Sequence, residues 1–156
     1  LRRSSAASDV YKRQGKHTLF EESLRSPLII SYENIVKPGE PSTAIVETVD
    51  ILPTICDLAQ IPAPANRAGT NLNTQLKDPG SQGHSALAFQ RNRMTIRNKQ
   101  YRLIVHKSGF RELYDFSDPN NVSINRAQEL PEMVNALEEQ LNQRLIDTGT
   151  KSVALW

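Results

Sequence analysis

The pattern of apolar and polar residues divides the chain near residue 84. Before it, residues 27–32 form a short, almost wholly apolar run, and roughly residues 50–60 carry apolar residues three and four positions apart. The run predicts a strand of a parallel sheet covered on both faces. The spacing predicts a helix with Asp50 as N-cap. The expected buried stripe of this helix consists of Val49, Leu52, Ile55, Cys56 and Ala59.

After residue 84 the apolar residues follow a period of two, which is typical of strands. Turn-like residues separate the short runs, so the economical prediction is an antiparallel meander. The four expected strands are Ser85–Gln90, Met94–Arg97, Tyr101–His106 and Glu112–Phe116.

A helical stripe follows the predicted meander and starts around Pro131, a good residue for a first turn. Its apolar positions are Leu130, Met133, Val134, Leu137, Leu141 and Leu145. A four-stranded meander needs one face covered, and this helix is the available cover. The fold class is therefore α/β, a strand and a helix followed by a small α+β subdomain. We expect the division at 15–84 and 85–156, with residues 62–84 as a linker or long surface loop.

Charge is unevenly placed along the 156 residues, whose formal net charge is +2. Residues 1–14 carry Arg2, Arg3, Lys12 and Arg13 against Asp9, which is +3, so the remainder sums to −1. These 14 residues resemble a peptide produced when sequencing-adapter DNA is translated, so we expect them to be foreign to the protein. The alternative is a flexible basic arm. No apolar run approaches the roughly 18–20 residues that span a bilayer, so no membrane partner is expected.

Three motifs, in order, resemble the sulfatase family of the alkaline-phosphatase-like superfamily. The first is Gly15-Lys16-His17-Thr18-Leu19-Phe20-Glu21, followed by Pro27-Leu28-Ile29-Ile30. The second is the segment 49–59, similar to the family's "VD-x-x-PT-x-x-DLAG" helix. The third runs from Ile96-Arg97 through Tyr101-Arg102 to Glu112-Leu113-Tyr114-Asp115 and Asp118-Pro119. The amino-acid sequence of the first motif is most similar to that of iduronate-2-sulfatase-type enzymes.

The resemblance implies that the strand and helix are the end of an alkaline-phosphatase-like sheet. It also implies hydrolysis of the sulfate ester of a sulfated sugar, such as iduronate 2-sulfate. The family uses a calcium ion and a formylglycine made from a C/S-x-P-x-R motif, and neither that motif nor metal ligands are found in these residues. We therefore expect a C-terminal portion that is inactive alone. Family members usually work in the periplasm, the lysosome or outside the cell. Oligomeric state is not indicated.

Lys16 is the one catalytic candidate, because the family's lysine at this place lies beside the metal and contacts the sulfate. A positioned ammonium can stabilise the negative charge that spreads over a sulfuryl group in transfer. The alternative is an ordinary exposed lysine. His17 is a candidate substrate-binding residue or a structural one. Glu21 and Glu22 are adjacent and do not face each other, so we expect ion-pair or cap residues rather than a catalytic pair.

Other residues favour structural roles. Cys56 lies on the apolar stripe and is expected to be buried, while His84 and His106 lack the spacing of metal ligands. Residues 91–111 contain seven Lys or Arg and no acid, interleaved with aromatic residues. No known nucleic-acid-binding pattern accompanies them, so we expect no nucleic acid partner. This segment either guides a polyanionic glycan or is a solvated face. The functional alternatives are a phosphate or phosphonate ester hydrolase and a non-catalytic glycan- or anion-binding module.

Overall fold

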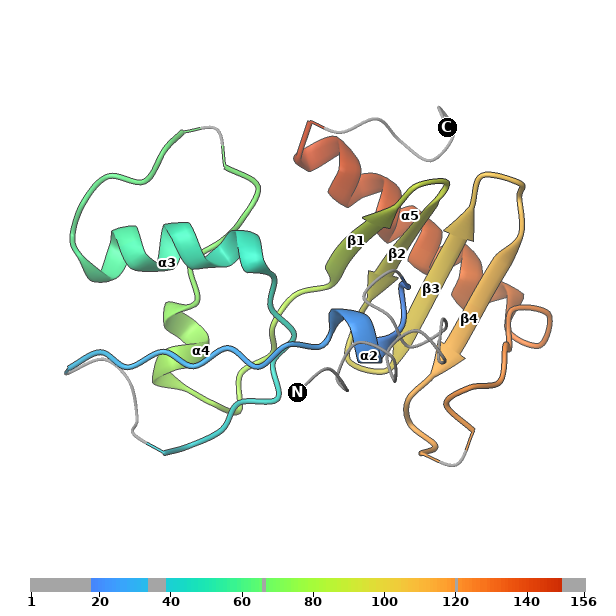
Figure 1. Cartoon of the computed structure of the whole chain (residues 1–156), viewed down its shortest axis with the longest axis horizontal. Helices are drawn as coiled ribbons and strands as arrows, with labels where there is room; N and C mark the ends of the chain where they lie inside the picture. The colour runs from blue at the N-terminus through green and yellow to red at the C-terminus, as the bar shows by residue number, and fades with distance from the viewer. Residues whose placement is uncertain (1–17, 34–38, 66, 120, 150–156) are drawn as a thin grey trace, which may run out of the picture.

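The computed structural model describes residues 18–33, 39–65, 67–119 and 121–149. Figure 1 shows two units, a helical unit built from the first half of the chain and a sheet with one long helix built from the second. The first unit contains the 3-10 helix η1 (Thr48–Asp50), α3 (Ile51–Leu58) and α4 (Asn73–Lys77), whereas α2 (Glu21–Leu24) lies against the sheet. The second contains β1 (Ala86–Gln90), β2 (Arg93–Arg97), β3 (Tyr101–His106), β4 (Arg111–Asp115) and α5 (Pro131–Asp147).

The second unit confirms the predicted meander. Its strands pair antiparallel in the order β1-β2-β3-β4, and each observed strand lies within one residue of its predicted bounds. Arg97 is opposite Arg102, and Leu103 is opposite Leu113. Because successive side chains point to opposite faces of a sheet, this register sorts the residues into two faces with different partners.

The face of the sheet behind the strands in Figure 1 packs against α5 and forms the main core. This confirms the predicted cover helix, and four of the six stripe positions are buried: Val134, Leu137, Leu141 and Leu145. They meet strand residues that are fully buried as well: Met94, Ile96, Leu103, Val105 and Leu113. Interlocked apolar side chains of this kind supply most of the stability of a small unit.

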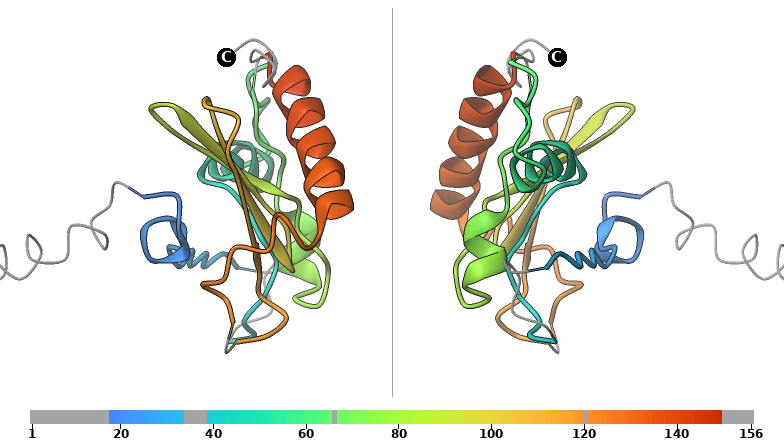
Figure 2. Two further views of the ribbon diagram at one scale, coloured as in Figure 1. Left: turned by 90° about the vertical axis from the view of Figure 1, so that its right-hand side faces the viewer. Right: turned by 90° about the vertical axis from the view of Figure 1, so that its left-hand side faces the viewer.

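The opposite face of the sheet carries α2, as the side views in Figure 2 show. A smaller buried cluster forms there from Leu19, Ile104 and Tyr114, with Phe20 and Phe116 packed around it. Residues 18–24 form a bend followed by the four-residue helix α2. The sheet is thus covered on one face by a long helix and on part of the other by one short turn.

The helical unit is held by polar contacts of Asp50 and Thr54, both buried. The Asp50 carboxylate accepts hydrogen bonds from the amides of Glu47 (2.7 Å) and Thr70 (2.9 Å). The Thr54 hydroxyl donates to the Asp50 carbonyl (2.6 Å) and accepts from the Leu72 amide (3.0 Å). Buried polar groups are stable only when paired in this way. These contacts fasten the segment before α4 against one side of α3.

Two expectations about the first unit are wrong. Residues 27–32 run extended but are not a strand, because no described strand pairs with them. Val49, Leu52, Ile55 and Ala59 are exposed, because the buried side of α3 carries Pro53, Thr54, Cys56 and Leu58 instead. Asp50 is the N-cap residue of α3, as expected, but its side chain makes no cap hydrogen bond there and instead forms a capping box with Glu47 at η1. Residues 62–84, expected to be a linker or long surface loop, also contain α4, a helix that their polar composition does not predict.

The two units are joined by a charged contact around Glu47. Its carboxylate accepts from the Leu87 amide of β1 (2.7 Å) and from the Arg144 guanidinium of α5. His84, in the connection between the units, places Nε2 at 2.6 Å from the Asp50 carboxylate and Nδ1 at 3.4 Å from Glu47. A chain of two carboxylates, a histidine and an arginine therefore fixes the helical unit beside the sheet.

Candidate functional site

Both candidate site residues, Lys16 and His17, lie outside the described residues. The chain is described from Thr18, whose hydroxyl is 2.7 Å from that of Ser23 across the first turn. The described geometry is therefore that of the residues that follow directly along the chain and hold α2 against the sheet.

Apolar contacts anchor the start of α2 to the sheet. Leu19 is buried against Ile104 and Tyr114. The ring of Phe20 meets the ring of Tyr114 edge-on, with centroids 5.5 Å apart and an interplanar angle of 74°. Edge-to-face pairs of this kind add to the free energy gained by burial. Residues 19 and 20 are thus fixed on the sheet face that α5 does not cover.

Glu21 adds an ionic anchor. Its carboxylate oxygen Oε1 accepts from Arg97 Nε at 2.9 Å and from Arg102 Nη2 at 2.5 Å. These two arginines are cross-strand partners on β2 and β3, so one carboxylate bridges two neighbouring strands. Partial burial of Glu21 acts to raise its pKa, but the hydrogen bonds and charges of Arg102 and Arg97 outweigh it and the pKa is lowered.

Two guanidinium groups share the one carboxylate of Glu21. The Arg102 side chain is only 4% exposed, and this burial lowers its pKa although Glu21 acts in the opposite direction. Arg97 stacks over the ring of Phe116, with Cζ 3.9 Å from the centroid. This confirms Glu21 as an ion-pair residue and shows that Arg102 is not part of a solvated face.

The basic segment 91–111 is divided between partners and faces. Arg97 and Arg102 lie on the face that carries α2, whereas Arg111 lies on the other and pairs with Glu138 of α5 (2.6 Å). Phe89 and Phe110 are exposed, but Tyr101 packs against the α5 core. The described residues therefore do not arrange these cations and rings as one surface.

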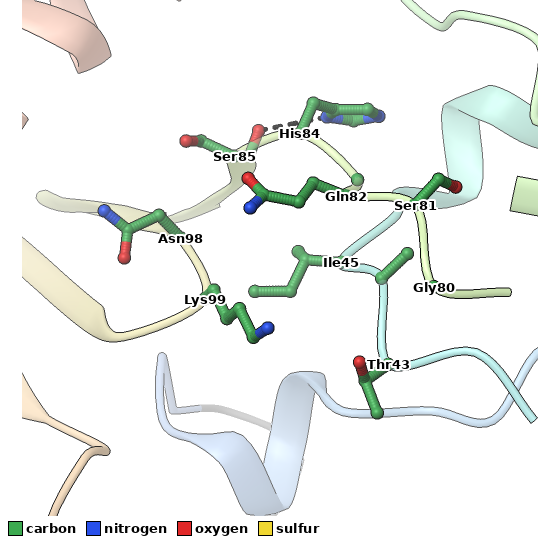
Figure 3. Close-up of a pocket in the computed structure, with 11 residues that line it drawn as sticks. Thr43, Ile45, Gly80, Ser81, Gln82, His84, Ser85, Asn98 and Lys99 are labelled. Carbon is green, nitrogen blue, oxygen red and sulfur yellow. Dashed lines mark hydrogen bonds between the residues drawn. The ribbon is translucent and has the colours of Figure 1, made fainter. Parts of the chain in front are cut away.

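A cavity of about 200 Å³ opens between residues 43–45, residues 80–85 and the turn from β2 to β3. In Figure 3, Ile45 lies between the side chains of Gln82 and Lys99, and the His84 ring points away from them. Gly83 permits this close approach, because a Cβ there would lie 1.9 Å from the Ile45 carbonyl oxygen. Lys99, Asn98 and Gln82 supply an ammonium and two amides, donors suited to hydroxyl or sulfate oxygens.

The remaining chemistry-bearing residues of the described part have structural partners. Cys56 is buried on α3, as expected. His84 lies in the joint between the units, and His106 Nε2 is 2.5 Å from a Glu112 carboxylate oxygen. Within the described ranges no group of three or more His, Cys, Asp or Glu could hold a metal ion. In the same ranges, no helix has the length and apolar character to cross a bilayer.

Comparison with known proteins decides the family. The model of the N-sulphoglucosamine sulphohydrolase C-terminal family matches residues 11–147, which is most of the chain. The chain belongs to this sulfatase family. The matched range includes all three motifs quoted above. It begins within residues 1–14, and the foreign origin of these residues stays a prediction.

Individual sulfatases agree with this assignment. An uncharacterized sulfatase of Schizosaccharomyces pombe is 31% identical over 153 residues, 88% of this chain and 28% of that protein. An N-acetylglucosamine-6-O-sulfatase of Bacteroides thetaiotaomicron is 38% identical over 65 residues, 42% of this chain and 12% of that protein. The structure of BT4656 in complex with its substrate D-glucosamine-2-N,6-O-disulfate has a TM-score of 0.68, with 22% identity. It covers 78% of this chain and 28% of that chain, and shows the same fold.

The chain thus spans between about an eighth and just over a quarter of the length of these sulfatases. The sequence motifs predicted the family and the C-terminal location. They could not reveal Arg97 and Arg102 as the partners of Glu21, since those contacts span 76 and 81 positions.

Proposed function

We propose that the chain is the C-terminal part of a sulfatase that hydrolyses the sulfate ester of a sulfated sugar. Residues 15–84 belong, in this proposal, to its catalytic α/β domain and residues 85–156 to its C-terminal subdomain. The match of the family model over residues 11–147 carries the proposal, and the agreement in fold with BT4656 supports it. The enzyme is expected to work in the periplasm, the lysosome or outside the cell.

Lys16 is the proposed catalytic residue of this part, with His17 as a substrate-binding residue. The support comes from α2: Leu19, Phe20 and Glu21 are all fastened to the sheet, so the candidate segment adjoins a fixed point. An ammonium that stabilises developing charge must be held in place before the reaction. The formylglycine and calcium that the family uses would supply the nucleophile and charge neutralisation, from residues that this chain does not contain.

The proposed substrate is a sulfated sugar, and two monosaccharide classes are in question. The amino-acid sequence of the first motif favours iduronate 2-sulfate as the substrate. The names of the relatives favour a sulfated glucosamine, since one is an N-acetylglucosamine-6-O-sulfatase and BT4656 is bound to a glucosamine disulfate. Rates on 2-O-sulfated iduronate and on 6-O-sulfated glucosamine, measured side by side, discriminate between them. Equal rates on sulfate and phosphate monoesters would favour the alternative phosphoesterase.

Substitution of Lys16 tests the catalytic role in a protein that carries this chain behind the rest of the sulfatase domain. Lys16→Ala should lower kcat/KM by about a hundred- to a thousandfold, because removing one donor to developing charge costs ~2.7–4 kcal/mol. Lys16→Arg should not rescue fully, since a planar fork places its donors differently. Lys107→Ala, in the exposed turn between β3 and β4, is the matched control. If Lys16→Ala has a kcat/KM close to that of the control, Lys16 is an ordinary exposed lysine and not a catalytic residue.

A further inference from the structure

The cavity beside the turn from β2 to β3 has walls that the fold fixes before any ligand binds. Residues 80–85 lie against the segment that leads into η1, and the His84 amide donates to the Ile45 carbonyl (3.1 Å). The side-chain amide of Gln75 in α4 donates to the Gln82 carbonyl (2.8 Å) and holds the same segment from its other side. A site that is already formed costs less conformational entropy on binding.

The third wall is the turn itself, which Asn98 organises. Its side-chain Oδ1 accepts from the amides of Gln100 (3.0 Å) and Tyr101 (2.7 Å), and its backbone amide donates to the Tyr101 carbonyl (3.0 Å). Because Oδ1 is bound to the backbone, the side-chain Nδ2 group is held in one orientation. No described residue accepts from Nδ2, so its protons are free to bind a ligand in the cavity.

Lys99 follows Asn98 and supplies the positive charge of the cavity. It has no ion-pair partner among the described residues, and no Asp or Glu lines the cavity. The one other ionisable residue of the lining, His84, places Nε2 at 2.6 Å from Asp50, and its ring points away from Lys99 in Figure 3. The same view shows the side-chain amide of Gln82 extending toward Asn98. The lining therefore offers one ammonium and two carboxamides without a competing carboxylate.

This lining is complementary to an anionic group carried on a ring with hydroxyl groups. An ammonium is a compact point charge that pairs with a sulfate or a carboxylate. Carboxamides both donate to and accept from hydroxyl groups, and they donate to the oxygens of an anion. A cavity of about 150 Å³ accommodates a ring the size of benzene. The cavity here measures about 200 Å³, which is enough for one six-membered sugar ring.

We propose that this cavity binds one anionic sugar unit. Lys99 pairs with the sulfate or carboxylate group of that unit, and Asn98 and Gln82 bind its other oxygens. The cavity and its donors are properties of this chain, and only the choice of a glycan as the source of the anion rests on the proposed function. In that function the cavity holds one sugar of the glycan and contributes to the choice of substrate. A free inorganic anion satisfies Lys99 but brings no hydroxyl groups to the two carboxamides.

NMR titration of this chain tests the site with four probes. Two are anionic sugars, N-acetylglucosamine 6-sulfate and glucuronate, and the other two are uncharged N-acetylglucosamine and inorganic sulfate. The side-chain amide signals of Asn98 and Gln82 report on the cavity itself. Lys99→Met removes the ammonium, and Lys107→Met is the matched control, because Lys107 is an exposed lysine in the turn between β3 and β4.

Asn98→Asp is a second variant that tests the cavity from the neighbouring residue. It retains the oxygen that accepts from the backbone amides of the turn and replaces the Nδ2 donor by a negative charge. None of the three variants removes a side chain from the buried core, so their melting temperatures should equal that of the original chain. If Asn98→Asp lowers the melting temperature, Lys99→Met decides alone.

We expect at least one anionic sugar to bind and to shift both amide signals, with the uncharged sugar and inorganic sulfate binding at least threefold more weakly. Lys99→Met and Asn98→Asp should each weaken binding at least tenfold, as expected for the loss of a hydrogen bond to a charged group. Lys107→Met should bind like the original chain. Three results would overturn the proposal: no binding of either anionic sugar, inorganic sulfate binding as tightly as the sugars, or equal weakening by Lys107→Met.

Turnover is measured separately, in a protein that carries this chain behind the rest of a sulfatase domain. Binding without turnover supports the cavity as a sugar site and counts against the proposed function. Turnover without binding of either anionic sugar refutes the site and leaves the proposed function intact.

Discussion

At the scale of single residues, the shared carboxylate of Glu21 gives a direct test by substitution. Glu21→Ala leaves Arg102 with its guanidinium buried and no acid beside it. Breaking a buried ion pair from one side costs about 3–5 kcal/mol, and the partial exposure of Glu21 favours the lower end, ~3 kcal/mol. Urea unfolding of the chain measures this loss. Glu22→Ala, at the exposed neighbouring position, should change the free energy of unfolding by less than about 0.5 kcal/mol. Equal losses in the two variants would refute the anchor.

The same carboxylate predicts a dependence of stability on pH. The pKa of Glu21 is lower in the folded chain than in the unfolded chain, because Arg102 and Arg97 stabilise the ionised form. Its contribution is therefore present above the pKa of an unfolded glutamate, about 4.3, and is lost as the pH falls through the folded value. The urea midpoint should fall between pH 6 and pH 3 by less in Glu21→Gln than in the original chain. Asp115, whose pKa is lowered by hydrogen bonds from Ser117, supplies the part of the decrease that both proteins share.

At this scale the sequence predicted roles better than partners. An ion-pair or cap role for Glu21 follows from its position beside Glu22. Cys56 is buried as expected, but the other four residues of the stripe from which this was inferred are exposed. Asp50 was assigned to the correct helix start but to the wrong contact. Its carboxylate meets His84, 34 positions away, and a contact across that distance depends on how the two units pack. Long-range polar pairs have no local signal in one sequence.

At the scale of elements, α5 is the part whose packing can be tested most directly. Leu137 is fully buried between α5 and the sheet, so Leu137→Ala should cost about 2–5 kcal/mol through lost burial and the cavity left behind. Ile146 lies on the same helix and is 61% exposed. Ile146→Ala should cost less than about 0.5 kcal/mol, and the difference is read from thermal or urea unfolding. Comparable losses at both positions would contradict the packing of α5 on this face.

The elements differ in how well local pattern determines them. The four strands and α5 bury their apolar sides against one another, so their periodicity alone predicted both their existence and their partners. Residues 27–32 and α3 carry equally clear patterns, but the surfaces that their patterns require are not among the described residues. The stripe on α3 was therefore predicted correctly as apolar and wrongly as buried. The five-residue α4, Asn73–Lys77, is too short and polar to show a periodicity.

For the whole molecule, charged side chains join the two units, whereas large apolar side chains of the first unit stay exposed. The joint of Glu47, Arg144, His84 and Asp50 pairs four ionisable side chains between the units. The apolar surface of the first unit has no such partner among the described residues. This asymmetry agrees with a chain that aligns with only part of its sulfatase relatives, and it makes the second unit the better candidate for a core that is stable independently.

The same view of the whole molecule leads to a prediction about activity. This chain alone should show no turnover on aryl or sugar sulfates, with or without added calcium. No Cys or Ser in the sequence is followed by Pro and Arg at the spacing that formylglycine formation requires, and Cys56 is buried. Without that nucleophile no sulfuryl transfer begins, so no charge develops on the sulfuryl oxygens for Lys16 to stabilise. Release of sulfate and of 4-nitrophenol from 4-nitrophenyl sulfate is measured in calcium and in a chelator, beside an active sulfatase in the same buffers. Calcium-dependent release above the buffer blank that is retained in Cys56→Ala would show that these 156 residues contain a nucleophile outside the motif. It would contradict the proposal that the nucleophile and the calcium ligands come from other residues of the sulfatase.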